Sequence, residues 1–128
     1  MTLTRTIAVA ALGFLGATFS AAAQDLENGA AQYRKCKTCH DLGDGAKNKT
    51  GPVLNGIIGR KVGSVEGFNY SASLKGLAAD GLTWTDDKLD KYIADPKSVV
   101  PNGSMAFAGI KDKEDRADLI AYLKKGGK

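Results

Sequence analysis

Cys36-Lys37-Thr38-Cys39-His40 is the stretch that decides how the rest of this chain is interpreted. Two cysteines three residues apart and an adjoining histidine form the pattern C-x-x-C-H, the signature of covalent c-type haem attachment. At this spacing both thiols can add to the two vinyl groups on one edge of a porphyrin. The histidine then lies beneath the iron as its proximal ligand. A single copy of the motif predicts a single haem.

Three other uses of the two cysteines compete with haem attachment. A disulfide between them would suit an exported protein. A thioredoxin-like redox site requires a surrounding βαβ unit, and no strand is predicted on either side of the motif. A structural zinc site requires about four ligands, almost always Cys or His, whereas the chain has 2 Cys and 1 His. The only histidine directly follows the second cysteine, which favours haem over all three.

The second axial ligand of the iron has one soft candidate. His40 is the only histidine, and Met1 belongs to the N-terminal segment that is expected to be removed. Met105 remains, in the loop 101–105 and 65 residues after His40, which is enough chain to reach the opposite face of a cofactor. A lone methionine more often fills a gap in a core, but His/Met ligation of haem iron is well known and raises its potential. Two strong axial ligands leave no open position for a substrate, so we do not expect an enzyme.

The first 23 residues have the layout of a secretory signal peptide. Arg5 precedes an apolar run from Ile7 to Phe19, and small residues follow up to Ala23. We predict cleavage before Gln24, which leaves residues 24–128 as one exported domain in the periplasm. The alternative is a retained membrane anchor, because the 17 residues 7–23 reach the short limit of the roughly 17–25 that a spanning helix needs.

The remaining residues predict a small all-α domain with long loops. Apolar periodicity and capping residues predict helices over residues 25–37, 70–77, 87–94 and 112–125. Pro96 is expected to end the third of these helices. Residues 41–68 and 99–109 lack sustained periodicity and are expected to be loops. Loops of this length in a compact domain need a ligand to organise them.

With these features, the chain resembles the class I cytochrome c family, which includes mitochondrial cytochrome c and the bacterial cytochromes c2. The resemblance runs from Gly29 to Lys125 and rests on the haem motif and on these further stretches: Thr50-Gly51-Pro52, Gly59-Arg60-Lys61, Gly67-Phe68-Asn69-Tyr70, Thr83-Trp84, Met105 to Ile110 and Asp118 to Leu123. It implies a cytochrome c domain over residues 24–128, with three to five helices around one haem. It also implies one-electron transport in a respiratory or photosynthetic chain.

The resemblance implies roles for residues on the histidine side of the haem. Pro52 matches the proline whose carbonyl accepts a hydrogen bond from the His40 ring, which fixes the orientation of the imidazole. Tyr70 and Trp84 match donors to a buried haem propionate, whose charge Arg60 would offset. Composition alone would make Trp84 an ordinary core aromatic.

On the methionine side, Tyr92 matches the tyrosine beside the methionine sulfur, and Phe107 matches the aromatic that covers the exposed haem edge. The chain also departs from the family pattern. Gly103 and Ser104 stand where the family commonly has Thr and Lys, and Leu74 stands where an Asn often contacts the haem environment. These departures put one propionate contact and one surface charge in doubt.

Lysines predict the surface that meets redox partners. Loss of Arg5 lowers the formal net charge from +4 to +3, which is a poor fit to nucleic acid. Any single lysine is usually just solvated, but five occupy positions that ring the exposed haem edge in the family and so predict docking of a monomer to acidic redox partners. They are Lys35, Lys37, Lys49, Lys97 and Lys111. The alternative function is a catalytic or gas-binding haem, which would require Met105 to be displaced.

Overall fold

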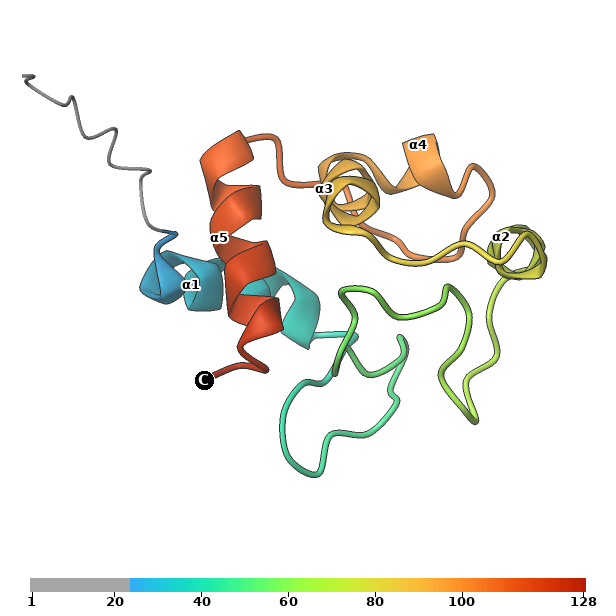
Figure 1. The fold of residues 1–128 in the computed structure, drawn as a ribbon, viewed down its shortest axis with the longest axis horizontal. Coiled ribbons are helices and arrows are strands. Elements are labelled where there is room, and N and C mark those ends of the chain that lie inside the picture. Colours follow the sequence, from blue (N-terminus) through green and yellow to red (C-terminus); the bar gives the residue numbers. More distant parts are fainter. Residues whose placement is uncertain (1–23) are drawn as a thin grey trace, which may run out of the picture.

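The computed structural model describes residues 24–128, and the expected signal peptide lies outside these residues. Five helices follow one another along the described chain (Figure 1): α1 (Leu26–Lys37), α2 (Ala72–Ala79), α3 (Asp86–Ala94), α4 (Pro96–Val99) and α5 (Lys113–Lys124). Between residues 24 and 128 the only β-type pairing is an isolated antiparallel bridge from Lys61 to Thr83. The prediction of an all-α fold with three to five helices and long loops is confirmed. No helix of the described part is long and apolar enough to cross a membrane.

Side-chain caps fix where the helices begin. Asp25 accepts hydrogen bonds from the backbone N–H groups of the first turn of α1, and Asp112 does the same for α5. Both helices therefore begin within one residue of their predicted starts. Ser71 caps α2, which begins two residues later than the sequence indicated. Pro96 ends α3 as expected but also occupies the first turn of α4, a short helix that the sequence analysis missed.

The first and last helices cross at a glycine. A Cβ atom on Gly29 would overlap the backbone carbonyl of Asp118 and lie 2.8 Å from the Cβ atom of Tyr122. The absence of a side chain lets the two helices pack closely, and the rings of Tyr33 and Tyr122 meet with their centroids 5.6 Å apart. Leu119 is fully buried at this contact, which stabilises the fold by about 1.5–3 kcal/mol relative to an exposed side chain.

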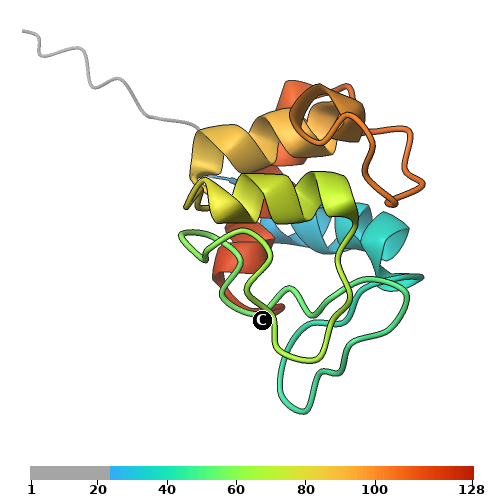
Figure 2. The same ribbon diagram turned by 90° about the vertical axis from the view of Figure 1, so that its right-hand side faces the viewer.

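The other helices and the long loops extend to one side of this crossed pair. α3 contacts both α4 and α5, whereas α2 contacts no other helix of the described chain. None of the residues of α2 is fully buried. In Figure 1, α2 lies apart from α3, and in Figure 2 the long loop that follows α1 extends away from both helices. This arrangement leaves a cavity between the loops and the helices, which holds the candidate site.

Candidate functional site

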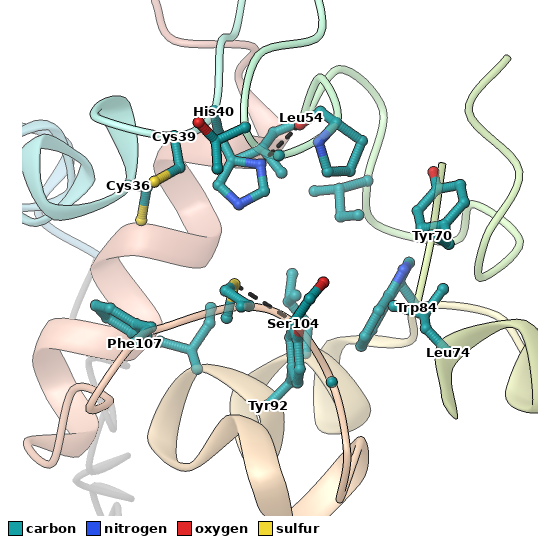
Figure 3. Close-up of a pocket in the computed structure, with 18 of the residues that line it drawn as sticks. Cys36, Cys39, His40, Leu54, Tyr70, Leu74, Trp84, Tyr92, Ser104 and Phe107 are labelled. Carbon is teal, nitrogen blue, oxygen red and sulfur yellow. Dashed lines mark hydrogen bonds between the residues drawn. The ribbon is translucent and has the colours of Figure 1, made fainter. Parts of the chain in front are cut away.

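One cavity collects every residue that the sequence analysis selected as a haem contact. The volume of the cavity is about 230 Å³, more than ten times the roughly 10–15 Å³ that one water requires. It is therefore large enough to hold an extended ligand. The ten predicted contacts that line it are Cys36, Cys39, His40, Pro52, Arg60, Tyr70, Trp84, Tyr92, Met105 and Phe107. Figure 3 shows part of this lining.

His40 is held at one wall by the turn that ends α1. Its backbone N–H donates a hydrogen bond to the carbonyl of Cys36 at 2.9 Å. The imidazole points into the cavity (Figure 3). Nδ1 of His40 lies 2.7 Å from the carbonyl of Pro52, and when protonated it donates to that oxygen (Figure 3). This leaves Nε2 as the nitrogen available to a metal. Burial lowers the pKa of His40, which favours the neutral imidazole that binds metal ions.

Gly51 brings the loop against the imidazole. A Cβ atom at this position would lie 2.7 Å from Nδ1 and 2.8 Å from Nε2 of His40, closer than side chains pack. Only glycine allows the backbone before Pro52 to lie this close to the ring. The sequence analysis quoted Gly51 in a matching stretch but gave it no role, because such a contact leaves no periodic or chemical signal.

The two cysteines face the cavity as free thiols, with no disulfide between them. Burial raises the pKa of Cys36 to about 11, with Lys35 opposing the effect. A thiol with this pKa is protonated at neutral pH, unlike the reactive thiolate of a thioredoxin-like site. No group of three or more Cys, His, Asp or Glu side chains between residues 24 and 128 could hold a zinc ion. A buried thiol that keeps its proton does not suit the thioredoxin-like alternative.

Met105 lies in the loop between α4 and α5 and lines the same cavity. The hydroxyl of Tyr92 donates to its sulfur at 3.7 Å, a contact drawn as a dashed line in Figure 3. Burial raises the pKa of Tyr92, so this hydroxyl keeps its proton at neutral pH. Gly109 fixes the other end of the loop, because its φ of +98° and its close approach to the carbonyl of Ala94 both exclude a side chain.

A third part of the cavity is polar and suits an anion. Nη1 of Arg60 donates to the carbonyls of Val53 and Asn55, both at 2.9 Å. Nε of Arg60, in contrast, is buried and has no hydrogen-bond partner among residues 24–128. The hydroxyl of Tyr70 accepts a hydrogen bond from the N–H of Val65 at 3.0 Å, so its own proton remains to be donated. A buried donor on a cation normally has an acceptor, and a carboxylate in the cavity would provide one.

The cavity as a whole fits a haem. Apolar side chains that the sequence analysis did not select, among them Leu54, Phe68 and Leu89, complete its lining and suit a flat macrocycle. Leu54 and Phe68 lie in the predicted loop 41–68, which has no sustained apolar pattern, and the apolar face that includes Leu89 does not separate core from cofactor contact. The unpartnered Nε of Arg60 suits a haem propionate, and the paired thiols beside His40 suit the vinyl groups.

The five lysines of the predicted docking surface are all exposed. Three of them form local hydrogen bonds. Nζ of Lys49 donates to the carbonyl of Lys37 at 3.0 Å, which brings these two residues together. Nζ of Lys111 donates to the carbonyl of Ala94 at 2.9 Å, and that of Lys35 to a glutamine oxygen in α1.

Comparisons with known proteins agree with this site. Residues 26–127 match the family model for cytochrome c. The chain is 50% identical over 104 residues to cytochrome c2 of Blastochloris viridis, covering 81% of this chain and 80% of that protein. It is 58% identical over 97 residues to cytochrome c-550 of Ancylobacter novellus, covering 75% and 90%. The solved structure of cytochrome c2 from Rhodospirillum centenum superposes with a TM-score of 0.75 at 34% identity, covering 81% and 99%. The chain therefore belongs to the cytochrome c family, and it is a mono-haem c-type electron carrier.

Proposed function

We propose that this electron carrier holds its haem iron between His40 and Met105 and acts in the periplasm after removal of residues 1–23. The observation that carries the proposal is the placement of these two side chains in the lining of one cavity, with the thiols of Cys36 and Cys39 beside His40. When bound, the haem supplies an iron that changes by one electron between its ferric and ferrous forms.

The surrounding residues hold this centre rigid. The carbonyl of Pro52 orients the imidazole, and the hydroxyl of Tyr92 orients the sulfur. Arg60, Tyr70 and Trp84 would bind a propionate, and the charge of Arg60 would favour its ionised form. Fixed contacts of this kind would limit movement of the two ligand side chains during electron transfer.

The same arrangement favours a carrier over the alternative of a catalytic or gas-binding haem. If His40 and Met105 both serve as ligands, no position would remain open for a substrate. The test is Met105→Ala in the haem-loaded protein. We expect the haem to stay attached through the thioethers, the reduced form to gain carbon monoxide binding, and the potential to fall. Carbon monoxide binding by the unaltered protein, or an unchanged potential in the variant, would refute ligation by Met105.

The exposed lysines are proposed to guide acidic partner proteins to the haem edge near Phe107. Such surface charges mainly change the rate of association and its dependence on salt. Reversing Lys35 and Lys97 to Glu should slow electron transfer to an acidic partner at low ionic strength. The effect should shrink above ~0.15 M salt, where the Debye length is below about 8 Å.

A matched control reverses Lys113 and Lys125, which lie at the two ends of α5 and do not line the cavity. This pair changes the net charge equally but should slow the reaction much less. Equal slowing by both pairs would mean that total charge, not a docking face, controls the rate.

A further inference from the structure

Asparagine–glycine pairs occur at 3 places in the chain: Asn28-Gly29, Asn55-Gly56 and Asn102-Gly103. In this dipeptide the glycine nitrogen is poorly shielded, because glycine has no Cβ atom. It can attack the side-chain Cγ of the asparagine. A five-membered succinimide then forms as the C–N bond to the side-chain amide breaks and ammonia leaves. Water opens the ring at either carbonyl and gives aspartate or isoaspartate.

At Asn28, the fold blocks this reaction by fixing the amide. Its Nδ2 donates to Oδ1 of Asp115 at 2.9 Å and to Oδ2 of Asp118 at 2.8 Å. The attacking nitrogen, that of Gly29, is also occupied, since it donates to the carbonyl of Asp25 at 2.8 Å. The reaction would have to break two hydrogen bonds to carboxylates and also open the first turn of α1.

At Asn55, a different pair of contacts fixes the side chain. Oδ1 of Asn55 accepts from the N–H of Gly43 at 3.1 Å, and its Nδ2 donates to the carbonyl of the same residue at 2.9 Å. The backbone carbonyl of Asn55 also accepts a hydrogen bond from Arg60 at 2.9 Å. Rotation of the amide toward Gly56 would break both side-chain bonds at once.

The side chain of Asn102 has no such restraint. Asn102 is exposed, and no hydrogen bond joins its side chain to any other residue between 24 and 128. It lies in the loop that follows α4, which projects from the body of the fold in Figure 2. The nitrogen of Gly103 donates to the carbonyl of Val100 at 3.0 Å, which closes a turn over Asn102. A single turn bond in an exposed loop opens at low cost in free energy.

We propose that Asn102 is a site of spontaneous deamidation in the folded protein, and that Asn28 and Asn55 are protected. Water is the only co-reactant, and one ammonia is released per event. The change places a carboxylate in the loop whose residues Ser104 and Met105 line the cavity. Isoaspartate also adds one carbon to the main chain of that loop.

The modification is expected to alter the redox centre, an effect that rests on the proposed ligation by Met105. An added negative charge in the loop that carries Met105 would stabilise the more positive ferric form. The potential of the Asn102→Asp variant should therefore fall below that of the unaltered protein. An unchanged potential would overturn this effect on the centre.

The site itself is tested by peptide mass mapping. The haem-loaded mature protein is held in mildly alkaline buffer, digested, and analysed for the exchange of amide for acid at each asparagine. We expect conversion at Asn102 with Asn28 and Asn55 intact. In guanidinium, where the fold is lost, all three should convert. The Asn102→Gln variant should abolish conversion at this position, because glutamine would need a less favourable six-membered ring.

Two results would overturn the proposal. The first is that Asn102 stays intact in the folded protein during a time in which the same residue deamidates in the unfolded chain. The other is conversion of Asn55 as fast as Asn102 in the folded protein, which would mean that the contacts with Gly43 give no protection. Neither result depends on the ligand of the iron, so this test is independent of the Met105→Ala test.

Discussion

Gly51→Ala is the substitution that most directly tests how the proximal ligand is held. The new Cβ atom would lie 2.7 Å from Nδ1 and 2.8 Å from Nε2 of His40, against an ordinary contact distance of roughly 3.5–4.0 Å. The ring or the loop must therefore move by about 1 Å. Overpacking of this kind costs about 1–3 kcal/mol. Loss of the 2.7 Å contact between His40 and Pro52 adds about 0.5–1.5 kcal/mol.

The free energy of unfolding of the haem-loaded variant should therefore fall by about 2–4 kcal/mol, measured by guanidinium denaturation followed by circular dichroism. An imidazole without its carbonyl partner is a weaker electron donor, so the reduction potential should rise. Gly76→Ala is the matched control, because Gly76 lies in α2 with nothing within 4 Å of a new Cβ atom. It should be neutral or stabilising by up to about 1 kcal/mol. Unchanged stability and potential in Gly51→Ala would refute the idea that this backbone positions His40.

Further predictions concern the crossed helices and the cofactor. Gly29→Ala should destabilise the protein by about 1–3 kcal/mol in thermal unfolding, because its Cβ atom would meet the rigid backbone of Asp118; a gain from helix propensity alone would contradict this. Burial raises the pKa of Tyr33 to about 12, above its unfolded value, so stability should be constant below pH ~10 and fall as the pH rises from about 10 to 12. Tyr33→Phe should remove this part of the pH dependence, and an unchanged alkaline profile would refute it. Cys36→Ser combined with Cys39→Ser should give a haem-free chain without cooperative unfolding, since the cavity then lacks its apolar filling; a sharp transition would show that the polypeptide folds alone.

The sequence predicted helices well where a cap and an apolar face coincide. Asp25 and Asp112 mark the starts of α1 and α5, and both helices also carry the apolar positions of their contact. The predicted start of α2 is two residues too early. The helix has no fully buried face to mark its start, which depends on the Ser71 cap alone. The sequence analysis does not predict α4, because it assigns Pro96 only the role of ending the preceding helix. Proline also suits the first turn of a helix, and Pro96 begins α4.

The site was predictable where side-chain chemistry is distinctive. The haem motif and the isolated Met105 stand out in the sequence, and the structure places both in the lining of one cavity. What the sequence could not reveal depends on backbone approach and on side-chain direction. The role of Gly51 against His40 is of the first kind. The hydrogen bond of Lys111 to the carbonyl of Ala94 at the end of α3 is of the second, because it holds this ammonium to its own chain.

The contact between α1 and α5 also determines the order of events when the chain is made. Gly29 lies near the beginning of the described residues, whereas Asp118 and Tyr122 lie near the end, so this contact closes almost the whole domain into one loop. Because the chain is made from its N-terminus, α5, the partner of α1, is among the last segments to become available. Until then Tyr33 has no helix to pack against, and the nascent domain cannot close. Because the haem-free chain is not expected to fold cooperatively, the thiols of Cys36 and Cys39 should be open to attachment before this contact closes.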